Sequence, residues 1–311
     1  LVAGFEEHNI ADLTEGNVVI KVSHSTINYK DALAATGTGK ILRRYPLVGG
    51  IDLAGAVVSS DDEEFAEGDA VLVNGCGLSE TVDGGYAQYA RIDSGSIVPV
   101  PDGMTAAETM QIGTAGYTAA LAIHRMEQNG QLPESGPIVV NGATGGVGSI
   151  AIDMLSGRGY EVVAVTGKDE QSDYLKSIGA SQILVRDEMD LGKRPMEKAL
   201  WAGAIDNLGG EQLTWLTRTV GYGGNIASVG LAAGFKLETT VMPFILRAVC
   251  LLGINSVDTP KDLRRRVWQR IGNDLRPQHL DKIGHKTVTF DELPDQFQSF
   301  IDGKVTGRIV V

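Results

Sequence analysis

A short apolar segment that runs directly into a glycine-rich turn constrains the fold of this chain more than any other feature. Residues 138–141 read Ile-Val-Val-Asn, the turn occupies residues 142–148, and a helical pattern continues through residues 149–155. Glycine lets a backbone turn sharply and approach a ligand closely, and the free N–H groups of a new helix attract a phosphate. Strand, tight turn and helix in this order predict a dinucleotide-binding unit.

The turn departs from the usual glycine pattern. Against G-x-G-x-x-G, residues 143–148 carry Ala143 where the first glycine should stand. A glycine-rich turn by itself can be an ordinary tight turn, so the motif alone is weak. The strand before it and the helix after it favour the dinucleotide interpretation.

The end of the next strand indicates which dinucleotide is bound. Residues 160–165 are followed by Thr166, Gly167 and Lys168. An NAD site usually places an acidic residue here, where it binds the ribose 2′-hydroxyl and repels a 2′-phosphate. In this chain Thr166 can donate to a phosphate oxygen and Lys168 can neutralise it. The prediction is NADP(H); the alternative is a solvated turn, and the acidic residues 169–170 can face either way.

Composition limits the class of protein. The chain has 311 residues, a formal net charge of −12 and two cysteines. Its length allows two domains, and its charge argues against nucleic acid or an anionic membrane as partner. No apolar run approaches the roughly 20 residues of a membrane span, and two isolated cysteines fit a reducing cytoplasm. The chain opens on Leu1 and not on Met, so its true start can lie upstream.

Three successive patterns predict the domain organisation. Residues 1–112 hold short β-type runs separated by Gly and Asp, which is typical of a mostly antiparallel or barrel-like domain. In residues 113–255 helical and β-type segments alternate, which predicts a parallel sheet with crossovers. Residues 256–311 hold two helices and end in a strand that we expect to return to the first domain. The strand candidates of the middle part are residues 137–141, 160–166, 182–185, 202–206, 224–229 and 249–255.

Motifs spread over the whole chain carry a family resemblance. Residues 28–31, 49–55, 143–148, 205–209 and 307–308 resemble the zinc-free medium-chain reductases, the quinone oxidoreductase-like branch of the alcohol dehydrogenase superfamily. Residues 38–41, 174–181, 201–206 and 240–247 resemble the acryloyl-CoA reductase group more narrowly. The resemblance implies an α/β chain with two domains. One is a GroES-like, mostly-β catalytic domain, formed by residues 1–112 and 256–311, and the other is a Rossmann domain with a doubly wound parallel sheet, formed by residues 113–255.

The residues argue against a metal. A catalytic zinc needs about three protein ligands and a structural zinc about four, with closely spaced cysteines. Cys76 and Cys250 are far apart, and the five histidines are scattered without ligand spacing. Where zinc alcohol dehydrogenases carry Gly-His-Glu, this chain has Gly-Ile-Asp, with Ile51 at the ligand position. We predict no metal.

Without zinc, reduction of an activated C=C bond is the favoured chemistry. Hydride reaches the β-carbon, and the substrate's own carbonyl delocalises the resulting charge. The protein must align the reactants and donate to the developing oxyanion. The catalytic candidates are Tyr29, Asn28 and Asp31; the resemblance implies that Tyr29 lies against the nicotinamide and that the other two face the substrate. The alternative is structural, with Asn28 capping a helix and Asp31 in its first turn.

The resemblance also implies contacts with cofactor. The expected cofactor-binding residues are Tyr29, Thr144, Gly145, Gly146, Val147, Gly148, Thr166, Gly167, Lys168, Arg186, Asn207, Gly230, Leu231, Ile254, Asn255 and Arg308. Coenzyme A carries phosphates, so an acidic acyl-CoA enzyme should concentrate its cations locally. The substrate-binding candidates are Lys40, Arg43 and Arg44; a second basic cluster, residues 264–266 with Arg270, is more typical of a solvated helix face.

The sequence therefore predicts a cytoplasmic, NADPH-dependent reductase of short 2-enoyl thioesters, most concretely of acryloyl-CoA to propanoyl-CoA. One alternative is an NADPH:quinone or enone oxidoreductase, and another is a sensor that binds NADPH without turnover. Residues 249–254 form a candidate edge strand that can pair in a homodimer, or a buried internal strand.

Overall fold

The computed structural model describes residues 3–311, and its chain divides into two compact units. Unit 1 contains the residues up to Ala115 together with Ser256–Gly272 and Gly284–Val311. Unit 2 contains Gly116–Asn255 and Asn273–Ile283. Leu1 and Val2, and with them the question of the chain start, lie outside the described residues.

Residues 273–283, which the sequence places in the catalytic domain, belong to unit 2. The cause is a buried carboxylate in the middle of helix α3 (Gly146–Gly157). Asp153 accepts hydrogen bonds from the backbone N–H groups of Gln278 and His279, both at 2.9 Å, and its other oxygen lies 2.8 Å from Nδ1 of His279. These bonds hold the short helix α8 (Leu280–Ile283) against α3.

Unit 1 is built on an antiparallel five-stranded sheet, as the sequence predicts. Its order is β5-β1-β3-β4-β6, and every neighbouring pair is antiparallel. The strands are β1 (Val18–His24), β3 (Asp52–Ser60), β4 (Ala70–Asn74), β5 (Tyr89–Ile92) and β6 (Val98–Pro99). Val18, Ile20 and Leu53 belong to a fully buried apolar cluster, since alternate side chains of each strand face one core.

A small three-stranded sheet completes unit 1 and joins the end of the chain to its beginning. It contains β2 (Thr26–Ile27), β13 (Lys286–Thr287) and β14 (Ile309–Val310). Because β14 runs antiparallel to β2, the predicted return of the last strand is confirmed. Directly after β2 comes α1 (Tyr29–Thr36), which contacts α9 (Leu293–Ile301).

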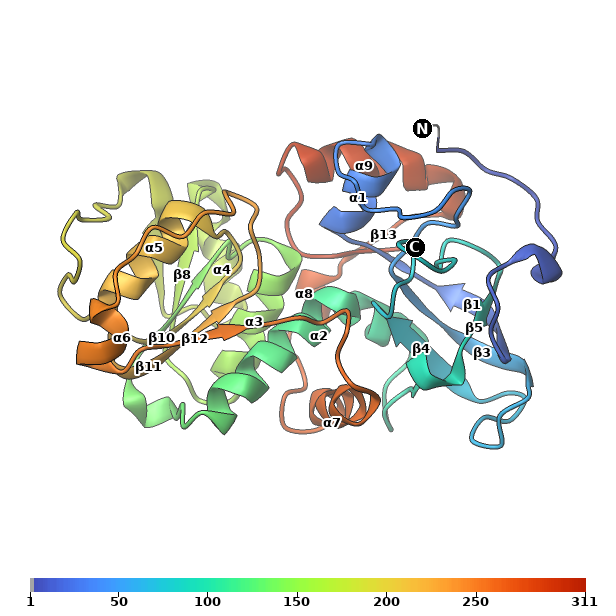
Figure 1. The fold of residues 1–311 in the computed structure, drawn as a ribbon, viewed down its shortest axis with the longest axis horizontal. Helices are drawn as coiled ribbons and strands as arrows, with labels where there is room; N and C mark the ends of the chain where they lie inside the picture. The colour runs from blue at the N-terminus through green and yellow to red at the C-terminus, as the bar shows by residue number, and fades with distance from the viewer. Residues whose placement is uncertain (1–2) are drawn as a thin grey trace. The chain divides into compact units, whose positions relative to one another are not determined.

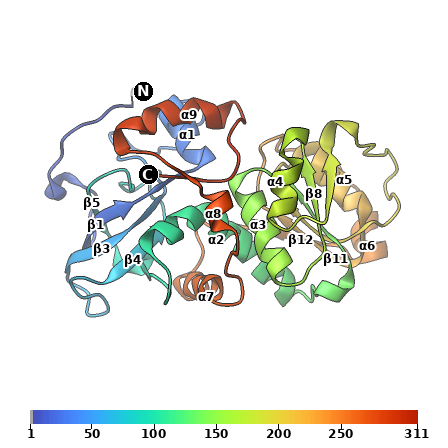
Figure 2. The same ribbon diagram turned by 180° about the vertical axis from the view of Figure 1, so that it is seen from behind.

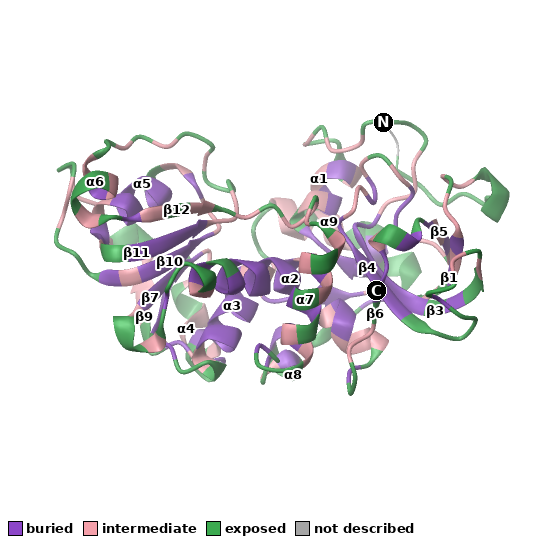
Figure 3. Ribbon diagram, turned by 60° about the horizontal axis from the view of Figure 1, so that its bottom comes forward, coloured by how far each residue is buried: buried purple, intermediate pink, exposed green. Residues whose placement is uncertain are grey.

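Unit 2 is a six-stranded parallel sheet of order β12-β11-β10-β7-β8-β9. The strands are β7 (Ile138–Asn141), β8 (Val162–Thr166), β9 (Gln182–Val185), β10 (Trp201–Asp206), β11 (Val220–Ser228) and β12 (Cys250–Gly253). The order reverses between β7 and β10, which makes the sheet doubly wound and marks the crevice where such sheets bind ligands. β7 and β8 are buried over their whole length, and the interior of the sheet is mostly purple in Figure 3.

Helices cover both faces of this sheet. α5 (Gly210–Thr219) and α6 (Met242–Arg247) lie in front of the strands in Figure 1, whereas α3 and α4 (Ser172–Ser177) lie in front of them in Figure 2. The remaining helices are α2 (Ala106–Gln128), which has non-helical backbone at Gly113, and α7 (Lys261–Gly272). None of the described helices is both long and apolar enough to span a membrane.

Candidate active site and cofactor site

The glycine turn after β7 has the geometry of a phosphate-binding turn. Gly142 has a φ of +58°, and α3 begins at Gly146, inside the glycine run and three residues earlier than the sequence pattern indicates. A Cβ at Gly148 would overlap the carbonyl oxygen of Gly142. The glycine that makes the tight turn is therefore Gly142, which explains why Ala143, whose side chain is buried, stands at the first position of the usual pattern.

A hydrogen-bonded set of side chains supports the turn from the next strand. Asn141 donates its amide N–H to Asp206 at 2.5 Å, and its oxygen accepts the backbone N–H of Asn207 at 2.6 Å. The amide of Asn207 donates to the backbone carbonyl of Asn141 at 2.7 Å. Burial raises the pKa of Asp206, while the Asn141 amide and the backbone N–H of Gly209 oppose that rise.

One buried atom of this set has no hydrogen-bond partner among the described residues. It is Oδ1 of Asn207, at the carboxyl end of β10. A buried acceptor without a donor is costly, and a bound hydroxyl or amide would satisfy it. Together with the turn, in which Gly148 has no room for a Cβ, this atom fits a nucleotide cofactor.

Cations gather at the ends of β8 and β9. A Cβ on Gly167 would lie 2.9 Å from a guanidinium nitrogen of Arg186, so the Arg186 side chain lies over the Gly167 backbone. Thr166 accepts the backbone N–H of Lys168 at 2.9 Å, and partial burial lowers the pKa of Lys168, against the charge of Glu170. The structure thus brings together the residues that the sequence selects for a 2′-phosphate. Asp169 turns towards α4, where it accepts from Ser172 at 3.2 Å.

The four predicted cofactor residues of later strands follow β11 and β12 directly. Gly230 donates its backbone N–H to the carbonyl of Asp206 at 3.1 Å, and Ile254 donates to that of Ser228 at 3.0 Å. Leu231 and Asn255 are exposed. These positions and the glycine turn share the carboxyl edge of one parallel sheet.

The catalytic candidates lie at the start of α1. Asn28 is its N-cap residue and Asp31 its third residue, and their side chains form a capping box, as the structural alternative expects. Both are buried, whereas Tyr29 is 46% exposed. The structure therefore distinguishes Tyr29, which can meet a ligand, from two neighbours whose side chains face the protein.

Asn28 and Asp31 belong to a buried polar cluster that also contains Asp52 and Arg308. Asn28 donates to Asp31 at 3.2 Å and to Asp52 at 2.7 Å, and its oxygen accepts from Arg308 at 3.0 Å. Burial raises the pKa of Asp31 to about 7; the nearby charge of Asp52 adds to this rise, and hydrogen bonds from Asn28 and Ile51 oppose it. Burial also raises the pKa of Asp52, against the charge of Arg308.

Arg308 is 2% exposed, and its guanidinium donates to groups of unit 1. Burial lowers its pKa, against the charges of Asp52 and Asp31. Its predicted contact with the cofactor stays a prediction. Sequence reasoning did not select Asp52 as a site residue, although a charged residue at the start of an apolar strand was a usable signal.

The two basic clusters differ in the exposure and the contacts of their side chains. Lys40, Arg43 and Arg44 are exposed in the segment after α1, and none of the three has an ion-pair partner among the described residues. In the second cluster, Arg264 is buried and donates to three backbone carbonyls, and Arg265 pairs with Glu64. Arg264 and Arg265 are therefore engaged within unit 1, whereas Lys40, Arg43 and Arg44 are exposed to solvent.

Ile51, at the position of the zinc ligand in alcohol dehydrogenases, is buried in the core of unit 1. Within residues 3–311, no three His, Cys, Asp or Glu side chains are grouped so that they could hold a metal ion. The prediction of no metal stays a prediction.

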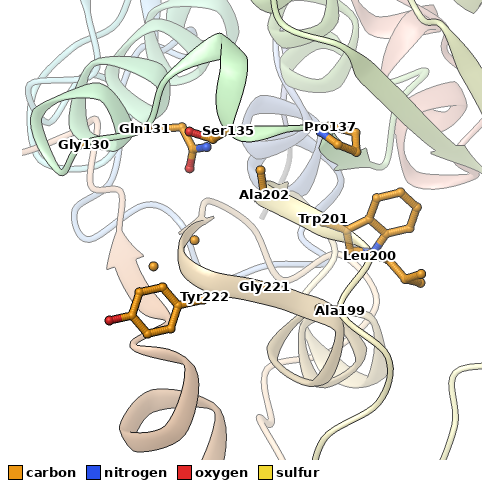
Figure 4. A pocket seen from close by; sticks show the side chains of 12 residues that line it. Gly130, Gln131, Ser135, Pro137, Ala199, Leu200, Trp201, Ala202, Gly221 and Tyr222 are labelled. Carbon is orange, nitrogen blue, oxygen red and sulfur yellow. The ribbon is translucent and has the colours of Figure 1, made fainter.

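A hollow of about 440 Å³ lies elsewhere in unit 2 (Figure 4). Its lining includes Gln131, Trp201 and Tyr222, from the amino ends of β10 and β11 and the loop before β7. It contains none of the predicted site residues; those of unit 2 lie at the carboxyl ends of the strands or in the glycine turn.

Comparisons with known proteins agree with this architecture. Residues 14–102 match the family of the alcohol dehydrogenase GroES-like domain, and residues 146–273 match the zinc-binding dehydrogenase family. The putative quinone oxidoreductase YhfP of Bacillus subtilis is 47% identical over 301 residues, which are 96% of this chain and 91% of that protein. The probable acrylyl-CoA reductase AcuI of Escherichia coli is 46% identical over 299 residues, which are 96% of this chain and 92% of that protein.

Solved structures are similar over the whole chain. Escherichia coli YhdH with bound NADPH has a TM-score of 0.96 at 45% identity and covers 100% of this chain and 95% of its own. Bacillus subtilis YhfP with NAD bound has a TM-score of 0.94 at 46% identity and covers 98% of this chain and 93% of its own. The predicted combination of a GroES-like domain and a Rossmann domain is confirmed.

Proposed function

Because this chain belongs to the quinone oxidoreductase-like branch of the medium-chain dehydrogenase/reductase family, we propose that it reduces the activated C=C bond of a short 2-enoyl thioester with NADPH. The concrete reaction is acryloyl-CoA with NADPH and a proton to propanoyl-CoA and NADP⁺. The observation that carries the thioester assignment is the group of exposed, unpaired Lys40, Arg43 and Arg44 in a chain of net charge −12.

The choice of NADPH rests on the ends of β8 and β9. Lys168 and Arg186 offer two cations where an NAD site would carry a carboxylate, and Thr166 adds a hydroxyl. YhdH was solved with NADPH, whereas YhfP was solved with NAD, so relatives of nearly equal identity differ in the cofactor that they hold. Lys168 and Arg186 of this chain support NADPH as its cofactor.

When bound, the cofactor supplies a hydride. The residues of the glycine turn, 144–148, bind its pyrophosphate, and Thr166, Gly167, Lys168 and Arg186 form the 2′-phosphate site. Asn207, Gly230, Leu231, Ile254 and Asn255 line the rest of the cofactor site at the carboxyl edge of the sheet. Oδ1 of Asn207 accepts a hydrogen bond that no described residue supplies.

Tyr29 is the residue that acts on the substrate. Its exposed hydroxyl donates to the thioester oxygen as negative charge develops there, which lowers the barrier. Asn28 has both amide N–H groups engaged by carboxylates, so it cannot donate to the substrate without losing one of them. Asn28 and Asp31 therefore hold the start of α1, and water supplies the proton that reaches the α-carbon.

The cations Lys40, Arg43 and Arg44 bind the phosphates of coenzyme A. They follow α1 in the chain, and Arg43 is anchored by its backbone N–H, which donates to the carbonyl of Glu80 at 2.8 Å. The side chain of Glu80 pairs with Lys30 of α1. One residue thus ties the basic segment to the helix that carries Tyr29.

A second candidate function is the reduction of quinones or enones. The 47% identity to a protein named putative quinone oxidoreductase favours it. Such a substrate has no phosphates, so this reaction would leave the three cations without a role.

We also propose a cytoplasmic homodimer formed along β12. This strand is the last at its edge of the sheet in the described chain, and Leu251 on it is exposed. Ile245 on the adjacent α6 is 70% exposed. An apolar edge strand next to an apolar helix surface favours self-association, because it would otherwise promote uncontrolled pairing. Light scattering of Leu251→Lys should then report a monomer.

The function is tested by incubating the protein with NADPH and either acryloyl-CoA or a benzoquinone, and following nicotinamide absorbance. We expect oxidation of NADPH with acryloyl-CoA. Oxidation with benzoquinone alone would remove the thioester assignment. Retained NADPH binding without turnover of either substrate would favour the non-catalytic sensor.

A further inference from the structure

The start of α1 is fixed by a buried set of charged and polar groups whose members come from distant parts of unit 1. Asp52 lies at the start of β3 and is 0% exposed. It accepts hydrogen bonds from the Asn28 amide at 2.7 Å and from the Thr114 hydroxyl at 2.6 Å. Arg308, just before β14, lies 3.9 Å from the Asp52 carboxylate. None of these groups lies within α1, and only Asn28, its N-cap residue, adjoins it.

This set orients the Asn28 amide in one way only. Its nitrogen faces the carboxylates of Asp31 and Asp52, and its oxygen faces the guanidinium of Arg308 at 3.0 Å. A flipped amide would place its nitrogen against the guanidinium and its oxygen against two carboxylates, which leaves donors and acceptors mismatched. Asp52 therefore fixes the position of the amide nitrogen, and Arg308 fixes that of the amide oxygen.

A break in helix α2 makes room for the set. Gly113 has φ +52° and ψ −160°, and a Cβ there would lie 2.5 Å from a guanidinium nitrogen of Arg308. The backbone N–H of Thr114, directly after the break, donates to the two Asp52 oxygens at 2.9 and 3.0 Å. The backbone of α2 is therefore non-helical at Gly113, between the residues whose backbone contacts Arg308 and Asp52.

The fold by itself does not require such a set. Burying charged groups costs free energy, and replacing a buried ion pair by apolar side chains of similar size is often neutral or stabilising. What the set achieves is a fixed geometry at the residue directly before Tyr29. A shift of about 1 Å in a reacting group can cost about 100-fold in rate, so this geometry matters to a reaction at Tyr29.

We propose that Asp52 and Arg308 are positioning residues, which fix the Asn28 amide and thereby the first turn of α1 that presents Tyr29. The proposal rests on the proposed function for its kinetic consequence. Its structural consequence, a single environment for the Tyr29 ring, is independent of any activity. Asp52 and Arg308 act through Asn28 and do not touch the substrate.

The test compares Asp52→Asn and Arg308→Lys with a matched control. Asp83 is also a buried carboxylate of unit 1; it accepts from the backbone and hydroxyl of Thr14 and from the backbone of Val48, each at 2.8 Å, and contacts no part of α1 by these bonds. Asp83→Asn should lower the melting temperature without changing kcat.

Two readouts are measured on the full-length protein. Turnover of acryloyl-CoA should show kcat reduced by about tenfold in Asp52→Asn and Arg308→Lys, and in Asp52→Asn the KM for NADPH should be unchanged. Incorporated 3-fluorotyrosine gives a ¹⁹F resonance for Tyr29, assigned by its loss in Tyr29→Phe. This resonance should be single in the parent and Asp83→Asn, and shifted or split in the two test variants.

Parental kcat and an unchanged ¹⁹F resonance in both test variants would overturn the proposal. If Asp52→Asn does not fold, Arg308→Lys decides, because lysine keeps the charge but loses the fork that reaches Asn28 and Thr26 together. A parent protein that does not reduce acryloyl-CoA would overturn the proposed function, while the ¹⁹F resonance would still decide the positioning role.

Discussion

The two candidate sites are built in opposite ways. In unit 2 the proposed pyrophosphate site is made of the backbone of seven consecutive residues, 142–148. Gly148 has no room for a Cβ, and Gly142 has a left-handed backbone conformation. In unit 1 the support of Tyr29 consists of side chains from residues as distant as Asn28 and Arg308. A site of the first kind tolerates no added atoms, whereas a site of the second kind tolerates no change of charge or of hydrogen-bonding direction.

The largest expected effect is at the backbone site. In Gly148→Ala the new Cβ would overlap the Gly142 carbonyl, so the turn must open. We expect NADPH binding to weaken by roughly 100-fold, equivalent to about 3 kcal/mol, measured by fluorescence titration. In Gly221→Ala the nearest atom is 3.4 Å away, and binding should be unchanged. Equal affinities of both variants and the parent would show that the turn does not contact the cofactor.

The next effect is at Tyr29. In Tyr29→Phe the hydroxyl is lost, and we expect kcat for acryloyl-CoA to fall by roughly 30-fold because the developing charge loses a donor. The melting temperature should stay unchanged, since this side chain is half-exposed. Tyr222, which is 86% exposed, provides the control Tyr222→Phe. Full activity of Tyr29→Phe would assign the donor role to another group.

Cofactor preference tests the cations of unit 2. Lys168→Glu places a carboxylate beside Arg186 and Gly167, where it would repel a 2′-phosphate. The ratio of kcat/KM for NADPH to that for NADH should fall by roughly 20-fold, because the 2′-phosphate loses the attraction of Lys168 and is repelled by the new carboxylate. Lys176→Glu, on the exposed side of α4, serves as the control. A ratio unchanged in Lys168→Glu would remove this residue from the 2′-phosphate site.

A smaller effect is expected at the basic segment of unit 1. In the double variant Arg43→Ala, Arg44→Ala the KM for acryloyl-CoA should rise by roughly fivefold, because exposed ion pairs contribute about 1 kcal/mol or less. The KM for acryloyl-pantetheine, which lacks the nucleotide phosphates, should not change. A parallel rise for both substrates would mean that these arginines do not bind phosphate.

A last effect, on stability and not on activity, is a pH dependence of the unfolding free energy in unit 1. The pKa of Asp31 is raised from 3.8 to about 7 in the folded protein, so between about pH 4 and pH 7 the folded chain holds a proton that the unfolded chain has lost. Unfolding free energy from this group therefore falls as pH rises through that window. The penalty of Asp31→Asn, measured by urea unfolding, should shrink from pH 5 to pH 7.5 by roughly 2 to 3 kcal/mol, because each pH unit between 5 and 7 contributes about 1.4 kcal/mol. A penalty independent of pH would contradict the raised pKa.

The difference between the two sites also explains what sequence reasoning could find. The alternation of helix and strand, the antiparallel first part and the glycine turn are local patterns, and each element was located within a few residues. Thr166, Lys168 and Arg186, which the sequence predicts as a 2′-phosphate site, lie at the neighbouring ends of β8 and β9, because the carboxyl ends of adjacent parallel strands share one edge. The start of α3 was misplaced by three residues, since glycines interrupt the helical pattern there.

By itself the sequence determined the two-domain organisation, and it indicated the proposed cofactor-binding edge and the candidate Tyr29. Only the tertiary structure decided that residues 273–283 join unit 2, that Asn28 and Asp31 face inward, and that Asp52 and Arg308 meet at the amide of Asn28. The physical reason is the separation along the chain of the residues that interact. Secondary structure and glycine turns follow from neighbouring residues, whereas a buried hydrogen bond between residues 28 and 308 depends on the return of the last strand to the second one.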